Sequence, residues 1–450
     1  MPPRPWSPES WRDLPARQQP VYPDPHALGR DLEKVRSYPP IVAPGETEGL
    51  KRRLAEAARG RAFVLQGGNC AERFLDCNAG SIANQLKILL QMSVILTYGA
   101  RRPVIRVGRI AGQYAKPRSE DSEVVDGITL PTYRGDAVNA IDSELRGRTP
   151  DPSRLLSCYF HSVATLNHVR ALIESGFADL RRPYNWNLQS IQRGRNWDEY
   201  RTVVDRILDA IHFMESFGGV RPEALGKADF YTSHEGLLLG YEEALTRHDP
   251  VSGRWYNTGT HMPWIGVRTR QLDGAHVEYF RGIANPIGIK IDAKSTPGEL
   301  LGLLEVLNPA DEEGKITFIT RMGAHRVEEA LAPLVRAVVE SGRPVGWSCD
   351  PMHGNSVTLA NGRKTRDFSV ILDELTRTFR IHREQRSRLC GVHFELTPDD
   401  VTECVGGSTV VTNEDLERRY ETYCDPRLND SQSLEMAFLI ARLMQGEADA

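Results

Sequence analysis

The chain has 450 residues, of which 40% are hydrophobic and 26% charged, and its formal net charge is −4. This composition is ordinary for a folded globular protein, and the small negative charge gives no reason to expect nucleic acid or an anionic membrane as the main partner. We find no uninterrupted apolar run of the roughly 18 residues that a membrane span requires. The first residues lack the apolar core of a signal peptide, and the seven cysteines show no paired spacing. We therefore expect a cytoplasmic protein with reduced thiols.

Residues 1–55 are interpreted as an N-terminal extension. Prolines recur between residues 22 and 46, and the stretch "DPHALGRDLEKVRSY" (24–38) has the pattern of one short helix. We expect this extension to pack against the rest of the chain. Residues 56–450 are expected to form one large domain.

Eight short apolar runs follow, and each stops at polar or glycine-rich residues. They cover residues 62–66, 103–109, 228–233, 262–267, 286–291, 316–321, 343–348 and 391–396. Most are followed by a helical pattern, as in 81–99 and in 327–342, which ends on a glycine. This alternation predicts parallel βαβ units, and eight of them favour a closed (β/α)₈ TIM barrel. A doubly wound open sheet is the alternative, because periodicity does not show closure.

The interval between the second and third predicted strands is too long for one βαβ unit. Within it, residues 151–176 and 198–218 both have helical periodicity. We interpret the segment of about residues 145–225 as helices inserted between elements of the barrel.

The predicted strands end in residues that can carry chemistry, as expected at the carboxyl ends of barrel strands. Six of these residues, in or just after the strands, are cations: Arg109, Lys116, Arg118, Arg268, Lys290 and Arg321. Guanidinium and ammonium groups suit phosphate and carboxylate ligands. The alternative is that each is a solvated surface cation. That alternative is weaker for Lys290 and Arg321, since both close apolar strands where an unpaired charge is costly.

A second group of residues suggests a metal site. Cys70, His353 and Glu395 follow or end three of the predicted strands, and an aspartate could complete the set. A thiolate, an imidazole and carboxylates suit a borderline divalent ion such as Mn, Co, Fe or Zn. A single cysteine is more often a small buried apolar residue, and a single histidine is more often a core or surface group.

In two stretches, residues close together in the sequence are expected to have different roles. In "GVHFEL" (391–396), His393 and Glu395 share one face of the strand. We expect the deeper His393 to be a core residue and Glu395 to reach the mouth. In "WSCDPMHGN" (347–355), Cys349 and Asp350 are expected to shape the loop that carries His353.

Ten motifs in this order resemble one known family. They are "GGNCAE", "RVGRIAGQYAKPRS", "YRGDAVN", "SHEGLLLGYE", "WIGVRTRQLDGAH", "ANPIGIK", "RMGAH", "CDPMHGN", "HFELTPDDVTECVGG" and "YETYCDPRLN". The chain is identified from them as similar to the type II (plant-like) 3-deoxy-D-arabino-heptulosonate 7-phosphate (DAHP) synthases, from about residue 20 to the C-terminus. The resemblance implies a TIM barrel with an N-terminal extension and inserted helices. It also implies condensation of phosphoenolpyruvate with erythrose 4-phosphate, the first step of the shikimate route to aromatic compounds.

The resemblance also assigns roles to matching residues. The implied ligands of a divalent metal, Mn²⁺ or Co²⁺ before Zn²⁺ or Fe²⁺, are Cys70, His353, Glu395 and Asp425. The implied phosphoenolpyruvate site is Arg109, Lys116, Arg268, Lys290 and Arg321. Arg118 and Ser119 would hold the aldose phosphate, and Glu235 would lie beside the substrates. Arg109 and Lys116 would orient the substrate carboxylate, while Glu235 or a water linked to the metal would activate the attacking water.

Two positions depart from the family pattern: Asn69 replaces an aspartate and Val267 replaces a glutamate. Both changes remove a negative charge near the expected substrates. A same-fold synthase that uses an amino analogue of the aldose therefore stands as an alternative, and a non-catalytic regulator as a more distant one. An aromatic amino acid effector and a homo-oligomer built through the N-terminal extension are implied by the resemblance alone.

Overall fold

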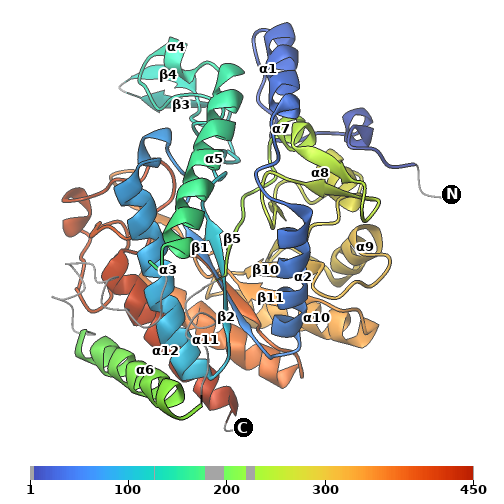
Figure 1. Cartoon of the computed structure of the whole chain (residues 1–450). Helices are drawn as coiled ribbons and strands as arrows, with labels where there is room; N and C mark the ends of the chain where they lie inside the picture. The colour runs from blue at the N-terminus through green and yellow to red at the C-terminus, as the bar shows by residue number, and fades with distance from the viewer. Residues whose placement is uncertain (1–4, 126, 178–196, 219–228, 449–450) are drawn as a thin grey trace.

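The computed structural model describes residues 5–125, 127–177, 197–218 and 229–448, and it is a mixed α/β structure built on one curled sheet. Eight parallel strands lie in the order β5-β2-β1-β14-β11-β10-β9-β8 (Figure 1). The strands are β1 (Phe63–Gly68), β2 (Val104–Arg109), β5 (Phe230–Thr232), β8 (Trp264–Ile265), β9 (Ile287–Asp292), β10 (Ile316–Arg321), β11 (Gly346–Cys349) and β14 (Gly391–Glu395). Each strand coincides with one of the eight predicted runs, so the prediction of eight parallel strands is confirmed. The order is cyclic along the chain, because β1, the first of these strands in the sequence, pairs with β14, the last.

The ends of the sheet also approach each other. Just beyond β5, the carbonyl of His234 accepts a hydrogen bond from the backbone N–H of Trp264 in β8, at 3.0 Å. The N–H of Gly236 donates to the carbonyl of Trp264 at 3.0 Å, and Glu235 and Trp264 form a parallel bridge. Backbone hydrogen bonds therefore connect the residues after β5 to β8.

Helices cover the outer face of the sheet (Figure 1). They are α3 (Ala79–Ala100), α8 (Ala275–Arg281), α9 (Pro297–Leu307), α10 (Val327–Ser341), α11 (Phe368–Glu384) and α12 (Asp430–Ala448). α2 (Pro44–Ala58) instead packs Leu50 and Leu54 against the inner face of the strands, at Val64 and Val107. The short α7 (Leu239–Ala244) packs on α1 (Pro25–Ser37). α10 ends at Gly342, which has the left-handed φ of 69° typical of a helix C-terminus. α3 and α12 pack together so closely that a Cβ on Gly99 would lie 2.3 Å from the Cβ of Ala441.

By length and mean hydropathy α3 could cross a membrane, although Asn84, Lys87 and Gln91 interrupt its apolar residues. However, 67% of its most apolar 18-residue window is buried inside the fold. α3 contacts β1, β2, α5, α6 and α12, which is the position of a core helix.

The chain between β2 and β5 carries the predicted insertion. α5 (Ser153–Glu174) and α6 (Trp197–Gly218) occupy the two predicted helical stretches, and both pack on α3. The segment also contains elements that periodicity did not indicate: a hairpin of β3 (Ser122–Val125) and β4 (Ile128–Pro131), and the short α4 (Leu145–Arg148). The remainder of the predicted insertion, at 178–196 and 219–225, lies outside the described residues.

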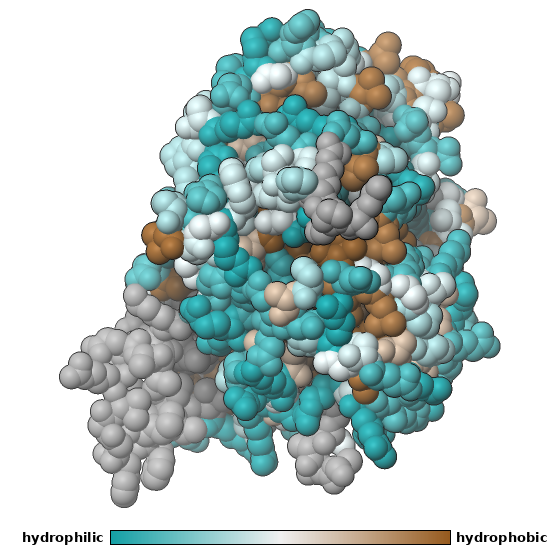
Figure 2. Space-filling model, turned by 90° about the vertical axis from the view of Figure 1, so that its right-hand side faces the viewer, coloured by the Kyte–Doolittle hydropathy of each residue, from teal (hydrophilic) through white to brown (hydrophobic). Residues whose placement is uncertain are grey.

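The N-terminal extension packs against the domain, as expected. It contains η1 (Ser10–Asp13) and α1 (Pro25–Ser37), whose N-cap Asp24 accepts hydrogen bonds from the N–H groups of His26 and Ala27. α1 contacts α5 and α7. Figure 2 views the molecule from the side of the N-terminus and shows apolar residues gathered in the middle of a largely hydrophilic face.

Smaller elements decorate the loops. They are η2 (Phe74–Asp76), η6 (Asp415–Glu417), a hairpin of β6 (Thr246–Asp249) with β7 (Arg254–Asn257), and a hairpin of β12 (Val357–Thr358) with β13 (Lys364–Thr365).

Strand register brings the polar strand ends to one edge. Gly68 pairs with Arg109 of β2 on one side and with Glu395 of β14 on the other. Gly68 has a φ of 148°, and a Cβ there would lie 2.7 Å from the carbonyl oxygen of Arg109, so a glycine is required at this close approach. Because all eight strands are parallel, their carboxyl ends share this edge.

Candidate active site

A cavity of about 380 Å³ opens at the carboxyl edge of the sheet. Its lining includes all six cations that the sequence singled out: Arg109, Lys116, Arg118, Arg268, Lys290 and Arg321. Cys70, Ser119, Glu235, His353 and Asp425 line the same cavity. Among the six cations, Arg268 is exposed, whereas the others are at least partly buried. The structure therefore brings together residues from eight separate segments of the chain.

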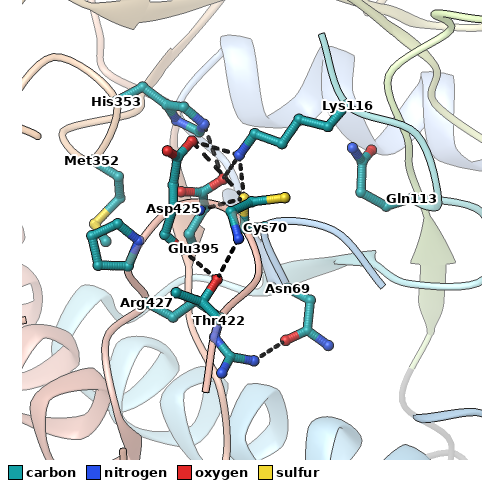
Figure 3. A network of polar contacts seen from close by, with 12 residues as sticks. Asn69, Cys70, Gln113, Lys116, Met352, His353, Glu395, Thr422, Asp425 and Arg427 are labelled. Atoms are coloured by element: carbon teal, nitrogen blue, oxygen red, sulfur yellow. Dashed lines mark hydrogen bonds and ion pairs between the residues drawn. The ribbon is translucent and has the colours of Figure 1, made fainter. Parts of the chain in front are cut away.

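Three potential metal ligands converge at this cavity, and two of them, Cys70 and Asp425, line it. Ligand atoms of Cys70, Glu395 and Asp425 all lie within 4.8 Å of one another. Cys70 comes from the loop after β1, Glu395 ends β14, and Asp425 lies in the loop before α12 (Figure 3). The N–H of Asp425 donates to Cys70 Sγ at 3.4 Å, which ties the two loops together.

His353 points toward the same group from the loop after β11 (Figure 3). Its Nε2 lies 2.9 Å from Glu395 Oε1, and its Nδ1 lies 2.7 Å from Asp350 Oδ2. When Nδ1–H donates to Asp350, Nε2 offers its lone pair on the side of Glu395 and Cys70. Asp350 therefore orients His353, beyond the loop-shaping role expected for it.

Glu395 is wholly buried and surrounded by cations. Its Oε2 lies 2.7 Å from Arg366 Nη1, and its Oε1 lies 3.1 Å from Arg109 Nη2. Burial alone raises the pKa of a carboxyl group, but His353, Lys116, Arg366 and Arg109 together hold the pKa of Glu395 well below its usual range. The carboxylate is therefore ionised and available as a ligand.

Lys116 lies among the potential ligands, and its ammonium group is stabilised by their negative charge. Its Nζ contacts Cys70 Sγ and Asp425 Oδ2, and it lies 3.8 Å from Glu395 Oε1. Burial opposes the charged form, yet Asp425, Cys70 and Glu395 raise the pKa of Lys116 well above its usual value. A thiol, two carboxylates and a neighbouring imidazole gathered around a cation fit a divalent metal ion.

Arg109 connects the potential metal ligands Cys70 and Glu395 to the core. Its guanidinium donates to the carbonyls of Asn69 and Cys70 at 3.0 Å each and to Glu395, and Nη1 lies 2.6 Å from His393 Nε2. These contacts occupy four of the five N–H groups of the arginine. His393 is wholly buried, as expected for a core residue.

Lys290 and Arg321 stand on the other side of the cavity. Lys290 Nζ lies 2.9 Å from Asp350 Oδ2, and burial lowers the pKa of this lysine. Arg321 Nη2 donates to the carbonyl of His353 at 2.7 Å, whereas its buried Nε has no partner within the described part of the chain. The indole N–H of Trp264 is likewise buried and unpaired among the described residues, and Trp264 lines the cavity. Two donors are thus free for an anionic ligand.

The outer end of the cavity is formed by the loop after β2. Arg118 Nη2 pairs with Glu123 Oε2 of β3 at 3.1 Å, and Arg268 Nη2 donates to Ser119 Oγ at 2.9 Å. Two guanidinium groups and a hydroxyl therefore surround this end, on the side away from Cys70.

Glu235 faces the cavity from the loop after β5. Its backbone N–H donates to Gln113 Oε1 at 2.8 Å, and its Oε1 is buried without a partner in the described residues. Burial raises the pKa of Glu235, although Lys290, Lys116 and Arg109 oppose this effect.

Sequence reasoning missed several residues of the site. Arg366 and Lys364, which pair with Glu395 and Asp425, lie in and after β13 rather than at the end of a sheet strand. Trp264 lies inside a predicted run, but nothing in its spacing signalled a free N–H. Asp425 lies far from any strand of the eight-stranded sheet, and only the family resemblance pointed to it.

The two departures from the family pattern occupy different surroundings. Asn69 Oδ1 accepts a hydrogen bond from Arg427 Nη1 at 2.8 Å, and Arg427 also pairs with buried Glu403 at 2.7 Å. Val267 lines the cavity beside Arg268. Asn69 therefore contacts Arg427 and does not line the cavity, whereas the side chain of Val267 forms part of the cavity wall.

Comparison with known proteins agrees with this geometry. The model of the class-II DAHP synthetase family matches residues 6–441. A phospho-2-dehydro-3-deoxyheptonate aldolase of Streptomyces coelicolor is 49% identical over 438 residues, which cover 97% of each chain. A protein of the same name from Neurospora crassa is 47% identical over 452 residues, covering 97% of this chain and 94% of the relative. The chain therefore belongs to the class-II DAHP synthetase family.

Proposed function

We propose that the protein condenses phosphoenolpyruvate with erythrose 4-phosphate and water to give DAHP and inorganic phosphate, the first step of the shikimate pathway. One observation carries this proposal. Six cations line one cavity, and the cluster of Cys70, Glu395 and Asp425 lies at its inner end. Two phosphorylated substrates need several cations, and an aldehyde acceptor benefits from a bound metal.

Phosphoenolpyruvate would lie on the inner side of the cavity. Arg268, Lys290 and Arg321 would neutralise its phosphate, and the free Nε of Arg321 supports this placement. Lys116 and Arg109 would orient the carboxylate. Arg109 has one N–H left after its contacts with the protein, so its main contribution would be to hold the loop of Cys70.

Erythrose 4-phosphate would place its phosphate at the outer end. Arg118 and Ser119 would bind it there, and the hydrogen bond from Arg268 to Ser119 supports a shared anion site. The aldehyde would then point inward, toward Cys70 and Asp425.

A divalent cation would be held by Cys70, His353, Glu395 and Asp425, with Mn²⁺ or Co²⁺ preferred and Zn²⁺ or Fe²⁺ as alternatives. When bound, such an ion supplies Lewis-acid polarisation of the aldehyde oxygen. The orientation of His353 by Asp350 supports this ligand set, because a histidine that binds a metal usually donates its other N–H to a carboxylate.

The protein's own residues would do the remaining work. Lys116 would lie close enough to the aldehyde oxygen to donate a proton as the C–C bond forms. Glu235 would accept a proton from the water that adds to the enol carbon, and its raised pKa and free Oε1 support that role. Arg268, Lys290 and Arg321 would hold the departing phosphate.

We propose further that the curled sheet closes as a (β/α)₈ barrel. The hydrogen bonds between the residues after β5 and Trp264 of β8 support closure, as does the cyclic strand order. The domain plan that we propose keeps residues 1–55 as an N-terminal extension and 56–450 as the barrel, with an insertion at about 145–225. The last turn of α2 (Pro44–Ala58) falls within the barrel range.

A substrate panel with purified protein tests the function. The proposal expects phosphate release from phosphoenolpyruvate with erythrose 4-phosphate, loss of activity on chelation and recovery with Mn²⁺ or Co²⁺. Turnover of an amino analogue of the aldose but not of erythrose 4-phosphate would favour the specialised-pathway alternative. No turnover of any pair by the metal-loaded protein would favour the non-catalytic regulator.

We propose in addition that an aromatic amino acid controls the activity, that the N-terminal extension builds a homo-oligomer, and that the protein works in the cytoplasm. Family membership supports these proposals. Rate measurements with added Trp, Phe and Tyr test the first, light scattering of the full chain and of a chain without the extension tests the second, and cell fractionation tests the third.

A further inference from the structure

The N-terminal extension is anchored beside the active site by buried charge. Trp11 Nε1 donates to Glu243 Oε2 at 3.1 Å, and Arg12 forms two hydrogen bonds to the same carboxylate. Arg36 of α1 also pairs with Glu243, whose side chain is only 2% exposed. The segment between η1 and α1, residues 14–24, therefore connects two elements that are each paired with Glu243 of α7.

Two glutamines of this segment reach loops of the cavity. Gln18 Oε1 accepts a hydrogen bond at 2.8 Å from the backbone N–H of Arg118, one of the residues proposed to bind the aldose phosphate. Gln18 has a φ of 62°, a left-handed conformation that residues other than glycine rarely adopt. Gln18 thus has an unusual backbone conformation, and its side chain contacts the loop of Arg118.

Gln19 makes a paired contact with a second loop. Its Nε2 donates to the carbonyl of Leu237 at 2.7 Å, and its Oε1 accepts from the N–H of Leu239 at 3.1 Å. Leu237 belongs to the loop that carries Glu235, and its N–H donates to the carbonyl of Glu235 at 2.7 Å. Adjacent residues of the extension therefore fix the loops that carry Arg118 and Glu235.

Among the described residues, the stretch 117–120 makes no backbone–backbone hydrogen bond, and the next one is from Thr132 N–H to the carbonyl of Asp121 at 3.0 Å. Lys116 N–H donates to the carbonyl of Arg134 at 2.9 Å, and Pro117 has no N–H to donate. The backbone N–H of Arg118, the next residue, is held by its hydrogen bond to Gln18 Oε1. The direction in which Arg118 and Ser119 present their side chains thus depends on a residue about 100 positions earlier.

We propose that Gln18 is a positioning residue through which the N-terminal extension sets the geometry of the aldose-phosphate half of the site. The hydrogen bonds of Gln19 to Leu237 and Leu239 fasten the extension next to it. The inference rests on the proposed function for the identity of the phosphate. Of the five residues proposed for phosphoenolpyruvate, only Arg268 bonds to the aldose-phosphate half, through Ser119. Within the described chain, the side chains of Arg109, Lys290 and Arg321 bond to residues outside the extension. Loss of Gln18 should therefore affect the two substrates differently.

The test compares Gln18→Met, which removes the acceptor and keeps the size, with Gln18→Gly, which removes the side chain but suits the left-handed backbone. Both variants should raise KM for erythrose 4-phosphate by about five- to tenfold, the loss expected for one hydrogen bond. KM for phosphoenolpyruvate should stay within about twofold. Gln385→Met, the same change at a hydrogen-bonded glutamine after α11, should leave both constants unchanged.

A merely structural role gives a different pattern. In that case Gln18→Met would lower thermal stability but bind both substrates normally, which would overturn the inference, as would an equal change in both KM values. If the wild-type protein does not turn over the substrate pair, the proposed function fails independently. The inference is then decided by calorimetry, in which inorganic phosphate should bind Gln18→Met more weakly than wild type when phosphoenolpyruvate is saturating.

Discussion

The guanidinium of Arg366 and the carboxylate of Glu395 form a salt bridge of 2.7 Å in which both side chains have no exposed surface. Arg366 also donates from Nε to Ser356 Oγ at 2.9 Å and from Nη1 to the carbonyl of Pro426. It thus connects the β12–β13 hairpin, the end of β14 and the loop that follows Asp425. A buried carboxylate with such a partner stays ionised without a metal, so the site is prepared before an ion binds.

Replacing Arg366 with Met should therefore affect both stability and metal affinity. Glu395 would lose its principal partner, at a cost of about 3–5 kcal/mol in the free energy of unfolding. The affinity for Mn²⁺ should fall about 10- to 100-fold, as for other residues that orient a ligand. Urea unfolding and metal titration measure the two effects. Arg363→Met, the same change at a surface ion pair of 3.8 Å, should shift stability by less than about 0.5 kcal/mol. Normal metal affinity in Arg366→Met would show that Glu395 does not depend on this partner.

Cys70 and Cys424 provide a matched pair for testing the thiol ligand. The thiol of Cys424 is hydrogen-bonded to that of Cys70, but only Cys70 lines the cavity and belongs to the cluster with Glu395 and Asp425. Cys70→Ser should weaken metal binding by about a hundredfold or more, because a neutral hydroxyl replaces a thiolate. Cys424→Ser should retain binding within about tenfold. Co²⁺ loading gives a thiolate-to-metal absorption band that should vanish in Cys70→Ser and persist in Cys424→Ser. A band that survives in Cys70→Ser would remove Cys70 from the ligand set.

The sequence predicts the strands and the residues at their ends because both follow from local periodicity. Arg109, Lys290 and Glu395 lie in strands whose apolar pattern fixes their position at the carboxyl edge. The meeting of Arg109, Lys290 and Arg321 in one cavity follows from the parallel pairing of their strands. Helix periodicity placed α1 and α5 equally well.

Residues in long loops could not be placed in the same way. Asp425 and Arg366 reach the site through the path of segments without periodicity. The pairing of Asp350 with both Lys290 and His353 depends on a turn whose course no local pattern encodes. Gln18 is a more extreme case, since its contact with Arg118 spans 100 residues of chain.

Arg321→Lys should weaken phosphoenolpyruvate binding selectively. An ammonium group cannot both donate to the carbonyl of His353 and offer a second N–H to a phosphate in the geometry of a guanidinium. Loss of one charge-assisted hydrogen bond should raise KM for phosphoenolpyruvate about 10- to 100-fold and leave KM for the aldose within about twofold. Arg326→Lys, an exposed arginine that donates to the carbonyl of Ala293 at 3.3 Å, is the control and should change neither constant. Equal increases for both substrates would place the phosphate of phosphoenolpyruvate elsewhere.

Glu374 of α11 should give the folded protein a distinct pH dependence. Its carboxyl accepts hydrogen bonds from the N–H of Met322 at 2.8 Å and from Asn355 Nδ2 at 2.6 Å, and burial raises its pKa to about 7. A raised pKa means that the folded state binds this proton more tightly than the unfolded chain does. The stabilisation is complete below the unfolded pKa of about 4.3 and is lost as the pH rises through about 7.

Wild type should therefore lose about 3 kcal/mol more stability than Glu374→Gln between about pH 4.5 and pH 7.5, as measured by urea unfolding at several pH values. Glu384→Gln, a half-exposed position on the same helix, should reproduce the wild-type slope. Parallel pH profiles for wild type and Glu374→Gln would mean that Glu374 titrates near its ordinary value.

Gly266→Ala should displace Glu235 without unfolding the protein. A Cβ at Gly266 would lie 2.1 Å from Glu235 Oε1, so the carboxylate must move away from the cavity position proposed for the attacking water. A shift of about 1 Å in a catalytic group can cost a factor of about 100, so kcat should fall about 10- to 100-fold with little change in thermal stability. Gly298→Ala on α9 is a matched control, because an added methyl there meets nothing within 4 Å and should preserve kcat. Steady-state kinetics should measure kcat for both glycine variants and for Glu235→Gln. If Glu235 is the proton acceptor, the two variants should lose kcat to similar degrees, whereas full activity in Gly266→Ala would exclude it.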